Sequence, residues 1–268
     1  MSLEPPPVLL DISPDGAAFL TLNRPERRNA FDEIMIEALS EAFETLRAAD
    51  HVRVLFLKGA GAAFCAGADL EWMRRQGAHT QEDNEADALA LADMLRRLHA
   101  LPMLTVALVQ GGAFGGGAGL VAACDYAVAT DGARFAFSEV RLGLTPATIS
   151  PYVVAAIGPR AARALFATAM PFDARRALEI GLIHEIALDA NDLARREERL
   201  ADLAFAAAPG AVADAKALVD DVSGRPIDHA LGQETARRIA RRRASPEGVE
   251  GLSAFLEKRD PAWARPAG

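Results

Sequence analysis

The chain has 268 residues, 51% of them hydrophobic, which is enough for one large domain with a substantial core or for a domain with an appendage. It carries 29 basic and 37 acidic residues, and this net charge of −8 disfavours a protein that binds the phosphate backbone of nucleic acids. Two cysteines without close spacing (Cys65 and Cys124) and five scattered histidines without a HExxH pair fit neither a disulfide framework nor a metal site.

The first 60 residues alternate between strand and helix patterns. A short apolar run over 17–22 predicts a strand, and the run 52–59, which ends in glycine, predicts a buried strand. Between them, residues 32–49 carry apolar side chains at helical spacing, and Asp32 is the expected N-cap. Strand, helix and strand in this order predict a crossover unit and a largely parallel sheet.

The same alternation continues to about residue 140. A helix is expected over much of 80–100, and a buried strand over 103–110 runs directly into a group of glycines. Residues 126–131 predict another strand, and 133–140 predict a strand or an extended edge. The expected apolar face of the long helix consists of Leu89, Leu91, Met94, Leu95 and Leu98.

Beyond residue 150 the pattern becomes mostly helical. Ser150 followed by Pro151 is typical of a helix N-cap and first helical position. Two further helices and a short strand or turn are expected over 160–169, 173–181 and 181–187, in that order. From about 191 the chain predicts helices separated by proline- and glycine-containing breaks. We therefore expect an α/β core over residues 1–190 and a helical region over 191–268.

Five glycines lie between 111 and 117, directly after an expected strand and before an expected helix, and Gly119 follows. The first N–H groups of a helix bind anions or a developing negative charge, and glycine lets a ligand approach them closely. The run lacks the lysine of a Walker loop and the spacing of a dinucleotide fingerprint. Close packing of a helix against the sheet is the alternative explanation at this point.

A second stretch, residues 59–73, favours the first explanation. It also follows an expected strand and also carries small residues before an expected helix. Two strand-end loops of this kind can place one N–H group each at a single point, which is the geometry of an oxyanion hole.

Together these stretches resemble the crotonase, or enoyl-CoA hydratase/isomerase, superfamily. The resemblance covers roughly residues 8–260, and five segments carry it in the order of the family. They are LNRPERRNAFDEIMIEAL (22–39), FCAGADL (64–70), GGAFGGGAGLVAACDYAVA (111–129), FSEVRLGLTP (137–146) and FDARRALEIGLIHEI (172–186). The resemblance implies an α/β fold, the crotonase ββα spiral, with a C-terminal helical region that mediates a homotrimer or a hexamer made of two trimers.

The resemblance also implies the partners of the protein. The substrate is an acyl-CoA, and no cofactor is implied, because coenzyme A belongs to the substrate. One branch of the family binds RNA, but the acidic charge argues against a nucleic-acid partner here. No signal-peptide pattern and no run of about 18 apolar residues occurs, so we expect no membrane partner and a cytoplasmic location.

By motif position, the resemblance implies that the backbone N–H groups of Ala68 and Gly116 bind the thioester carbonyl oxygen. Arg28 is the family position that meets a CoA phosphate, although an ordinary surface arginine is the alternative. Asp69 corresponds to a position near the ligand, and it is equally a candidate N-cap for a helix over 70–76. The residues expected to contact the substrate are Arg28, Ala30, Ala66, Gly67, Asp69, Leu70 and Gly115.

Hydratases of the family commonly use two glutamates. The second aligns with Glu139, whereas the first aligns with Gly119 and is missing. We expect the glycine to leave the space in front of it to water or to substrate. Glu139 is then the single acid/base, able to deprotonate water and return a proton to Cα, or to move one proton between carbons.

Gly119 and the segment GLTPATISPYVV (143–154) together resemble hydratases that act on branched 3-methylglutaconyl-type or isoprenoid acyl-CoAs of leucine and acyclic-terpene breakdown. The expected activity is therefore hydration of a 2-enoyl-CoA, and the alternatives are a Δ3,Δ2-enoyl-CoA isomerase or a non-catalytic acyl-CoA binder. Trp72 and Met73 are expected in the general core, with an acyl pocket as the alternative.

Overall fold

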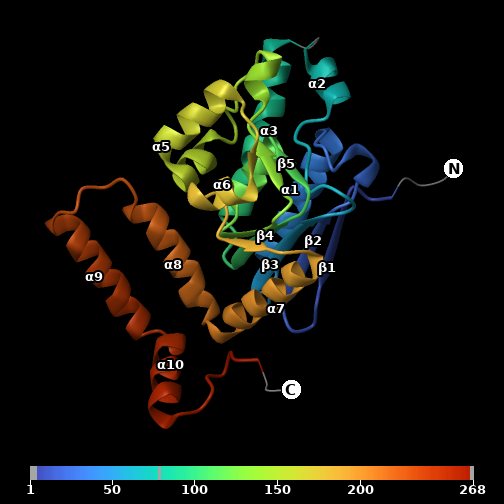
Figure 1. Ribbon diagram of the computed structural model, residues 1–268. Coiled ribbons are helices and arrows are strands. Elements are labelled where there is room, and N and C mark those ends of the chain that lie inside the picture. The colour runs from blue at the N-terminus through green and yellow to red at the C-terminus, as the bar shows by residue number, and fades with distance from the viewer. Residues whose placement is uncertain (1–4, 78–79, 266–268) are drawn as a thin grey trace. The chain divides into compact units, whose positions relative to one another are not determined.

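A computed structural model describes residues 5–77 and 80–265 of the protein. The chain divides into two compact units, one up to Arg199 and one from Leu200 on. The first unit contains the sheets and the helices α1–α6, and the second consists of helices (Figure 1).

A six-stranded sheet organises the first unit, with the strand order β1-β2-β3-β4-β6-β9. The first pair, β1 and β2, is antiparallel, and every later pair is parallel, as the strand and helix alternation predicts. The central strands are buried on both faces, which explains their nearly continuous apolar runs. The strands are β1 (Val8–Ile12), β2 (Ala17–Leu22), β3 (Val54–Gly59), β4 (Leu104–Val109), β6 (Tyr126–Thr130) and β9 (Glu185–Ala187).

A second sheet has three short strands in the order β5-β7-β8, and the sequence did not predict its first strand. β5 (Gly112–Phe114) lies inside the glycine run, and it pairs with β7 (Arg134–Ala136), which pairs in turn with β8 (Phe172–Asp173). The turn from β4 into β5 needs Gly111, because φ is +63° there and a Cβ would lie 1.9 Å from the Ala62 carbonyl oxygen.

Two predicted helices of the first unit are present with small changes of their ends. α1 (Glu33–Ala48) begins after Asp32, whose side chain accepts a hydrogen bond from the Met35 amide at 2.9 Å. α3 (Gln81–His99) buries Met94, Leu95 and Leu98, but Leu89 is 67% exposed. Leu89 was therefore wrongly assigned to the apolar face of this helix. α2 (Leu70–Gln76) and α4 (Gly116–Ala123) follow the two loops of small residues.

Helix α5 (Ser150–Thr168) agrees in part with the sequence prediction. It consists of two helical segments that meet at Gly158, where φ is +74° and the conformation is not helical, and the second segment covers the predicted range 160–169 except for its last residue. Ser150 is not its N-cap: Ile149 takes that place, and the Ser150 hydroxyl donates to the Ala147 carbonyl at 2.8 Å. The next helix, α6 (Ala174–Glu179), is capped as predicted, since Asp173 accepts from the Arg176 amide at 2.8 Å.

The C-terminal part of the chain is helical, as expected. α7 (Ala190–Ala206) spans the boundary at Arg199, and α8 (Pro209–Val222), α9 (His229–Arg243) and α10 (Pro246–Glu257) follow. Proline lies at the first turn of α8 and α10, where a backbone donor is not needed.

Three structural features are absent from residues 5–77 and 80–265: a membrane-spanning helix, a metal-binding cluster and a disulfide bond. No helix there combines the length and apolar character needed to cross a lipid bilayer. No group of histidine, cysteine and carboxylate side chains in these ranges has a metal-binding arrangement. Neither Cys65 nor Cys124 forms a disulfide bond in these ranges, and Cys65 is buried.

Candidate active site

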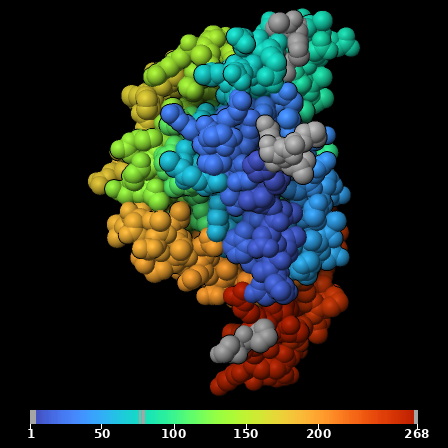
Figure 2. All heavy atoms as spheres, turned by 90° about the vertical axis from the view of Figure 1, so that its right-hand side faces the viewer, coloured from blue at the N-terminus to red at the C-terminus, as the bar shows by residue number. Residues whose placement is uncertain are grey.

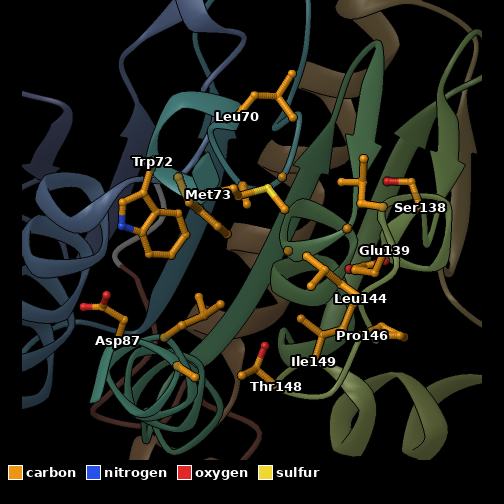
Figure 3. A pocket seen from close by; sticks show the side chains of 18 of the residues that line it. Leu70, Trp72, Met73, Asp87, Ser138, Glu139, Leu144, Pro146, Thr148 and Ile149 are labelled. Carbon is orange, nitrogen blue, oxygen red and sulfur yellow. The ribbon is translucent and has the colours of Figure 1, made fainter. Parts of the chain in front are cut away.

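A cavity of about 640 Å³ opens in the first unit at the ends of the two loops of small residues. Loop residues 66–68, 115–116 and 138–139 form one part of its lining, and side chains from α2, α3 and the segment before α5 form the rest. Figure 3 shows Trp72 and Met73 on one side of this cavity and Glu139, Leu144 and Ile149 on the other.

The first loop orients the amide of Ala68 away from its neighbours. The Phe31 amide donates to the Gly67 carbonyl and the Asp69 amide donates to the Phe31 carbonyl, both at 2.7 Å. Ala68 is thus the bridge partner of Phe31, so its own amide points away from Phe31, and the residue lines the cavity. Its N–H group has no hydrogen-bond partner within the described part of the chain.

The second loop leaves another amide without a partner. Gly115 has a φ of +49°, and its own amide donates to the Ala136 carbonyl at 2.9 Å. Gly116 is the first residue of α4, so its N–H group has no partner within the helix. No described residue accepts a hydrogen bond from this N–H group. Gly116 lines the same cavity as Ala68.

The two loops are in direct contact, and glycine makes this possible. A Cβ on Gly67 would lie 2.7 Å from the Phe114 carbonyl oxygen, and a Cβ on Gly117 would lie 2.5 Å from the Cys65 carbonyl oxygen. Both distances are shorter than van der Waals contact, so any side chain there would push the loops apart. Glycine at these two positions therefore allows two loops to pack closely, which differs from the packing of a helix against the sheet that the sequence offered as the alternative.

Glu139 lies beside the second loop. It starts the 3-10 helix η2 (Glu139–Leu142), and its Oε1 is 3.1 Å from the position of a Cβ on Gly115. Its Oε2 is buried and accepts no hydrogen bond from the described residues. Burial raises the pKa of this carboxyl above its ordinary value, although its own backbone N–H partly offsets the effect. A buried carboxyl with one oxygen that has no hydrogen-bond partner is suited to proton transfer.

The space in front of Gly119 is filled, contrary to expectation. A Cβ on Gly119 would lie 2.2 Å from Cγ2 and 2.8 Å from Cβ of Ile149. Ile149 is buried and lines the cavity, so it closes this face to water and substrate with an apolar group. The sequence did not indicate this pairing, because the two residues are distant in the chain.

Gly119→Ala is expected to lower the free energy of unfolding by about 1–3 kcal/mol, because the added methyl group overlaps Ile149. Ile149→Ala removes Cγ2 and should relieve part of this overlap. In a double-mutant cycle measured by urea unfolding, we expect a favourable coupling of at least about 1 kcal/mol. Additive effects would contradict the contact.

Three of the expected substrate-binding residues do not line the cavity. Asp69 is 7% exposed and caps α2, accepting from the Glu71 and Trp72 amides at 2.9 and 3.0 Å. Its Oδ2 also pairs with Arg27 at 3.0 Å, so the structure assigns this carboxylate the capping role. Ala30 is buried, and Arg28 is exposed. Arg28 stays next to the first loop, since its carbonyl accepts from the Ala66 amide at 2.9 Å.

The N-terminal segment and α2 are joined by ion pairs that the sequence analysis did not predict. Arg27 pairs with Glu71 at 3.1 Å, and Arg75 pairs with Glu33 at 2.8 Å. Atoms of the two segments, blue and teal, lie side by side on the face in Figure 2. Trp72, Met73 and Leu91 line the cavity, and Trp72 also belongs to the buried core, as expected.

Comparison with known proteins shows the family of the chain. The family model described as enoyl-CoA hydratase/isomerase matches residues 13–266. The chain belongs to the enoyl-CoA hydratase/isomerase family. An enoyl-CoA hydratase from Shewanella pealeana has the same fold, with a TM-score of 0.92 at 42% identity over 96% of each chain. Both the crotonase fold and the C-terminal helices predicted from the sequence are thus confirmed.

Relatives within the enoyl-CoA hydratase/isomerase family have different activities. The enoyl-CoA hydratase AKT6-1 of Alternaria alternata is 36% identical over 246 residues, which cover 91% of this chain and 80% of the relative. The ethylmalonyl-CoA decarboxylase of Homo sapiens is 34% identical over 185 residues, which cover 69% of this chain and 60% of the relative. Family membership therefore shows the scaffold and is consistent with an acyl-CoA substrate, and the reaction depends on the residues of the site.

Proposed function

We propose that the protein adds water to a 2-enoyl-CoA thioester, with Glu139 as the single acid/base. One observation supports this reaction. The amides of Ala68 and Gly116 have no hydrogen-bond partner among the described residues, and the Glu139 carboxyl, whose Oε2 has no partner either, lies beside these two contacting loops. Amides held in place before the reaction stabilise the oxygen on which negative charge develops.

The proposed hydration proceeds in two proton-transfer steps through an enolate. The Glu139 carboxylate takes a proton from water as the water oxygen bonds to C3 of the substrate. The electrons of the C2=C3 double bond move toward the thioester and give an enolate, whose oxygen accepts from the Ala68 and Gly116 amides. Glu139, now protonated, gives its proton to C2, so one water has been added. A raised pKa makes the carboxyl a better base in the first step.

Isomerisation of a 3-enoyl-CoA is the second candidate, and Ile149 favours it. The apolar side chain stands in front of Gly119, so this face offers no carboxylate to hold a water. Glu139 would then take a proton from C2 and return it to C4, through the same enolate. This reaction needs one acid/base and consumes no water.

Two substrates and one solvent label separate these candidates. Crotonyl-CoA and 3-methylglutaconyl-CoA should each lose the absorbance of the conjugated enone when the enzyme is added. In H2¹⁸O the product should carry one ¹⁸O atom at C3. Conversion of a 3-enoyl-CoA without uptake of label, together with inert 2-enoyl-CoAs, would identify an isomerase instead. Binding of all esters without turnover would identify an acyl-CoA binder.

We propose in addition that the protein is a homotrimer or a dimer of trimers, assembled through its C-terminal helices. Helix α10 exposes four large apolar side chains at Val249, Leu252, Phe255 and Leu256, which a partner subunit would cover. Light scattering of the purified protein should give the mass of three or six chains. A monomer at micromolar concentration would contradict the assembly.

A further inference from the structure

Asn29 is a buried polar residue that the mechanism does not use. It follows the 3-10 helix η1 (Pro25–Arg27), it is completely buried, and it does not line the cavity. Its φ is +58°, a left-handed conformation that asparagine adopts more readily than most side chains. Burial of an amide side chain is costly unless its polar atoms are paired, so its hydrogen bonds show which parts of the chain it holds together.

The side chain of Asn29 joins two segments of the chain. Its Nδ2 donates to the carbonyl oxygens of Ala60 and Ala63 at 2.9 Å and of Phe64 at 3.1 Å. Its Oδ1 accepts from the Arg24 amide at 2.9 Å. The first three bonds hold the loop that leaves β3, and the fourth fixes the turn on which Asn29 itself lies. One side chain thus sets the position of this turn relative to the loop.

The backbone beside Asn29 runs along the first loop of the cavity and contacts it at three positions. The Arg28 carbonyl accepts from the Ala66 amide at 2.9 Å. The Asn29 carbonyl accepts from the Cys65 thiol at 3.0 Å. Phe31 makes the third contact, through its two hydrogen bonds of 2.7 Å described above. The loop is therefore aligned against a segment whose position depends on Asn29.

This alignment decides which amide of the loop stays unpaired. Among residues 64–69, the Ala68 amide is the one donor without a partner in the described part of the chain. A shift of one residue along 28–31 would turn the Ala68 amide toward this segment and release another amide. The partners of the other five amides, in chain order, are the carbonyls of Gln110, Gly112 and Arg28, the Cys65 sulfur and the Phe31 carbonyl.

We propose that Asn29 is a positioning residue for the amide of Ala68, because its side chain holds residues 28–31 in register with the loop that carries this N–H group. The inference rests on the proposed function, in which the Ala68 amide binds the thioester oxygen. Asn29 acts in this role through the loop and does not touch the substrate. Displacement of a donor by about 1 Å is enough to impair catalysis, since the stabilisation depends on a geometry set before the reaction.

Asn29→Asp tests this role with little change in the size of the side chain. The carboxylate can still accept from the Arg24 amide, but it cannot donate to the three carbonyl oxygens and repels them instead. We expect kcat on the preferred enoyl-CoA to fall about 10²-fold. The dissociation constant of the unreactive ester butyryl-CoA, measured by calorimetry, should stay within about fivefold of wild type.

Infrared difference spectroscopy of bound butyryl-CoA, labelled with ¹³C at C1, reports on the amide itself. Donation by the Ala68 and Gly116 amides polarises the thioester carbonyl, so its stretching frequency should be lower in the wild-type complex than in water. We expect Asn29→Asp to reverse about half of this lowering, because one of the two donors is displaced. A loss of folding stability alone would leave the band of the bound ester unchanged.

Thr105→Val is the matched control, because it removes another completely buried polar group of the same unit. The Thr105 hydroxyl donates to Oδ2 of Asp125 at 2.8 Å and accepts from the Asp125 amide at 2.9 Å, and neither bond involves the two loops. Both variants should lower the midpoint of urea unfolding. Only Asn29→Asp should change the carbonyl band, and Thr105→Val should keep kcat within about twofold of wild type.

Cys65→Ala provides the same test if Asn29→Asp does not fold. It removes the sulfur that donates to the Asn29 carbonyl and accepts from the Gly67 amide at 3.4 Å, and it introduces no larger side chain. We expect kcat to fall about threefold to tenfold, with a smaller change of the carbonyl band in the same direction.

Two results would overturn the assignment of Asn29. One is an unchanged carbonyl band in folded Asn29→Asp, or in Cys65→Ala where Asn29→Asp does not fold. The other is an equal change of band and kcat in Thr105→Val. Either result leaves turnover by the wild-type protein, and with it the proposed function, intact. Wild-type protein that turns over no enoyl-CoA, or binds butyryl-CoA without lowering the carbonyl frequency, contradicts the proposed function and the inference together.

Discussion

Glu139→Gln is expected to lower kcat for hydration by about 10³-fold, because the amide can neither accept a proton from water nor return one to C2. The substitution keeps the size of the side chain, so the cavity should keep its shape. Affinity for a saturated acyl-CoA, measured by calorimetry, should stay within about threefold of wild type. Glu37→Gln, on the exposed face of α1, is the matched control and should retain full activity.

The raised pKa of Glu139 adds two results to this prediction. Hydration needs the carboxylate, so kcat/KM should fall as the pH drops through a pKa above the ordinary 4.5. The folded protein penalises the ionised form, so this residue costs stability as the pH rises from 4.5 through its folded pKa. Glu139→Gln removes that cost, and its melting temperature at pH 7.5 should equal or exceed that of wild type. Turnover that survives in this variant would refute the role of Glu139.

Gly117→Ala is expected to lower kcat/KM by about 10²-fold, because it moves the two amides apart. A Cβ at this position would lie 2.5 Å from the Cys65 carbonyl oxygen and 2.8 Å from the Cys65 Cβ. Neither atom belongs to a flexible side-chain end, so a loop must shift. The free energy of unfolding should also fall by about 1–3 kcal/mol, which urea unfolding measures.

Gly132→Ala provides the control for this substitution. A Cβ on Gly132 would meet no atom within 4 Å, and the residue lies in an exposed turn of the same unit. We expect unchanged kcat/KM and a change in unfolding free energy of at most about 0.5 kcal/mol. If Gly117→Ala behaved like this control, the contact between the loops would not position the amides.

The sequence by itself determined the alternation of parallel strands and helices in the first unit, because local patterns encode it, but it did not indicate the strands β1 and β5. Continuous apolar runs gave the buried strands β3 and β4, and helical spacing with Asp32 as N-cap gave α1. The order of strands and helices is compatible with few sheet topologies, because crossover connections between parallel strands have a fixed hand. Five motifs in order identified the family, which the family model and the solved structures confirm.

Local patterns failed where the decisive contact comes from a distant residue. The strand β5 has few side chains that mark it, and its pairing with β7 stabilises it. Ser150 has the sequence of an N-cap, but the chain places Ile149 there, packed against Gly119. Leu89 fits the apolar spacing of α3 and yet faces solvent.

The same distinction between local patterns and distant contacts applies to the candidate site. Small residues after two strands were visible in the sequence as candidate oxyanion loops, and Glu139 was visible as a single carboxylate in a family motif. Only the tertiary structure showed that Oε2 of Glu139 lacks a partner and that Arg74 lines the cavity while its neighbour Arg75 pairs with Glu33. The physical reason is that burial, ion pairing and steric overlap depend on residues far apart in the chain, whereas strand and helix patterns depend on near neighbours.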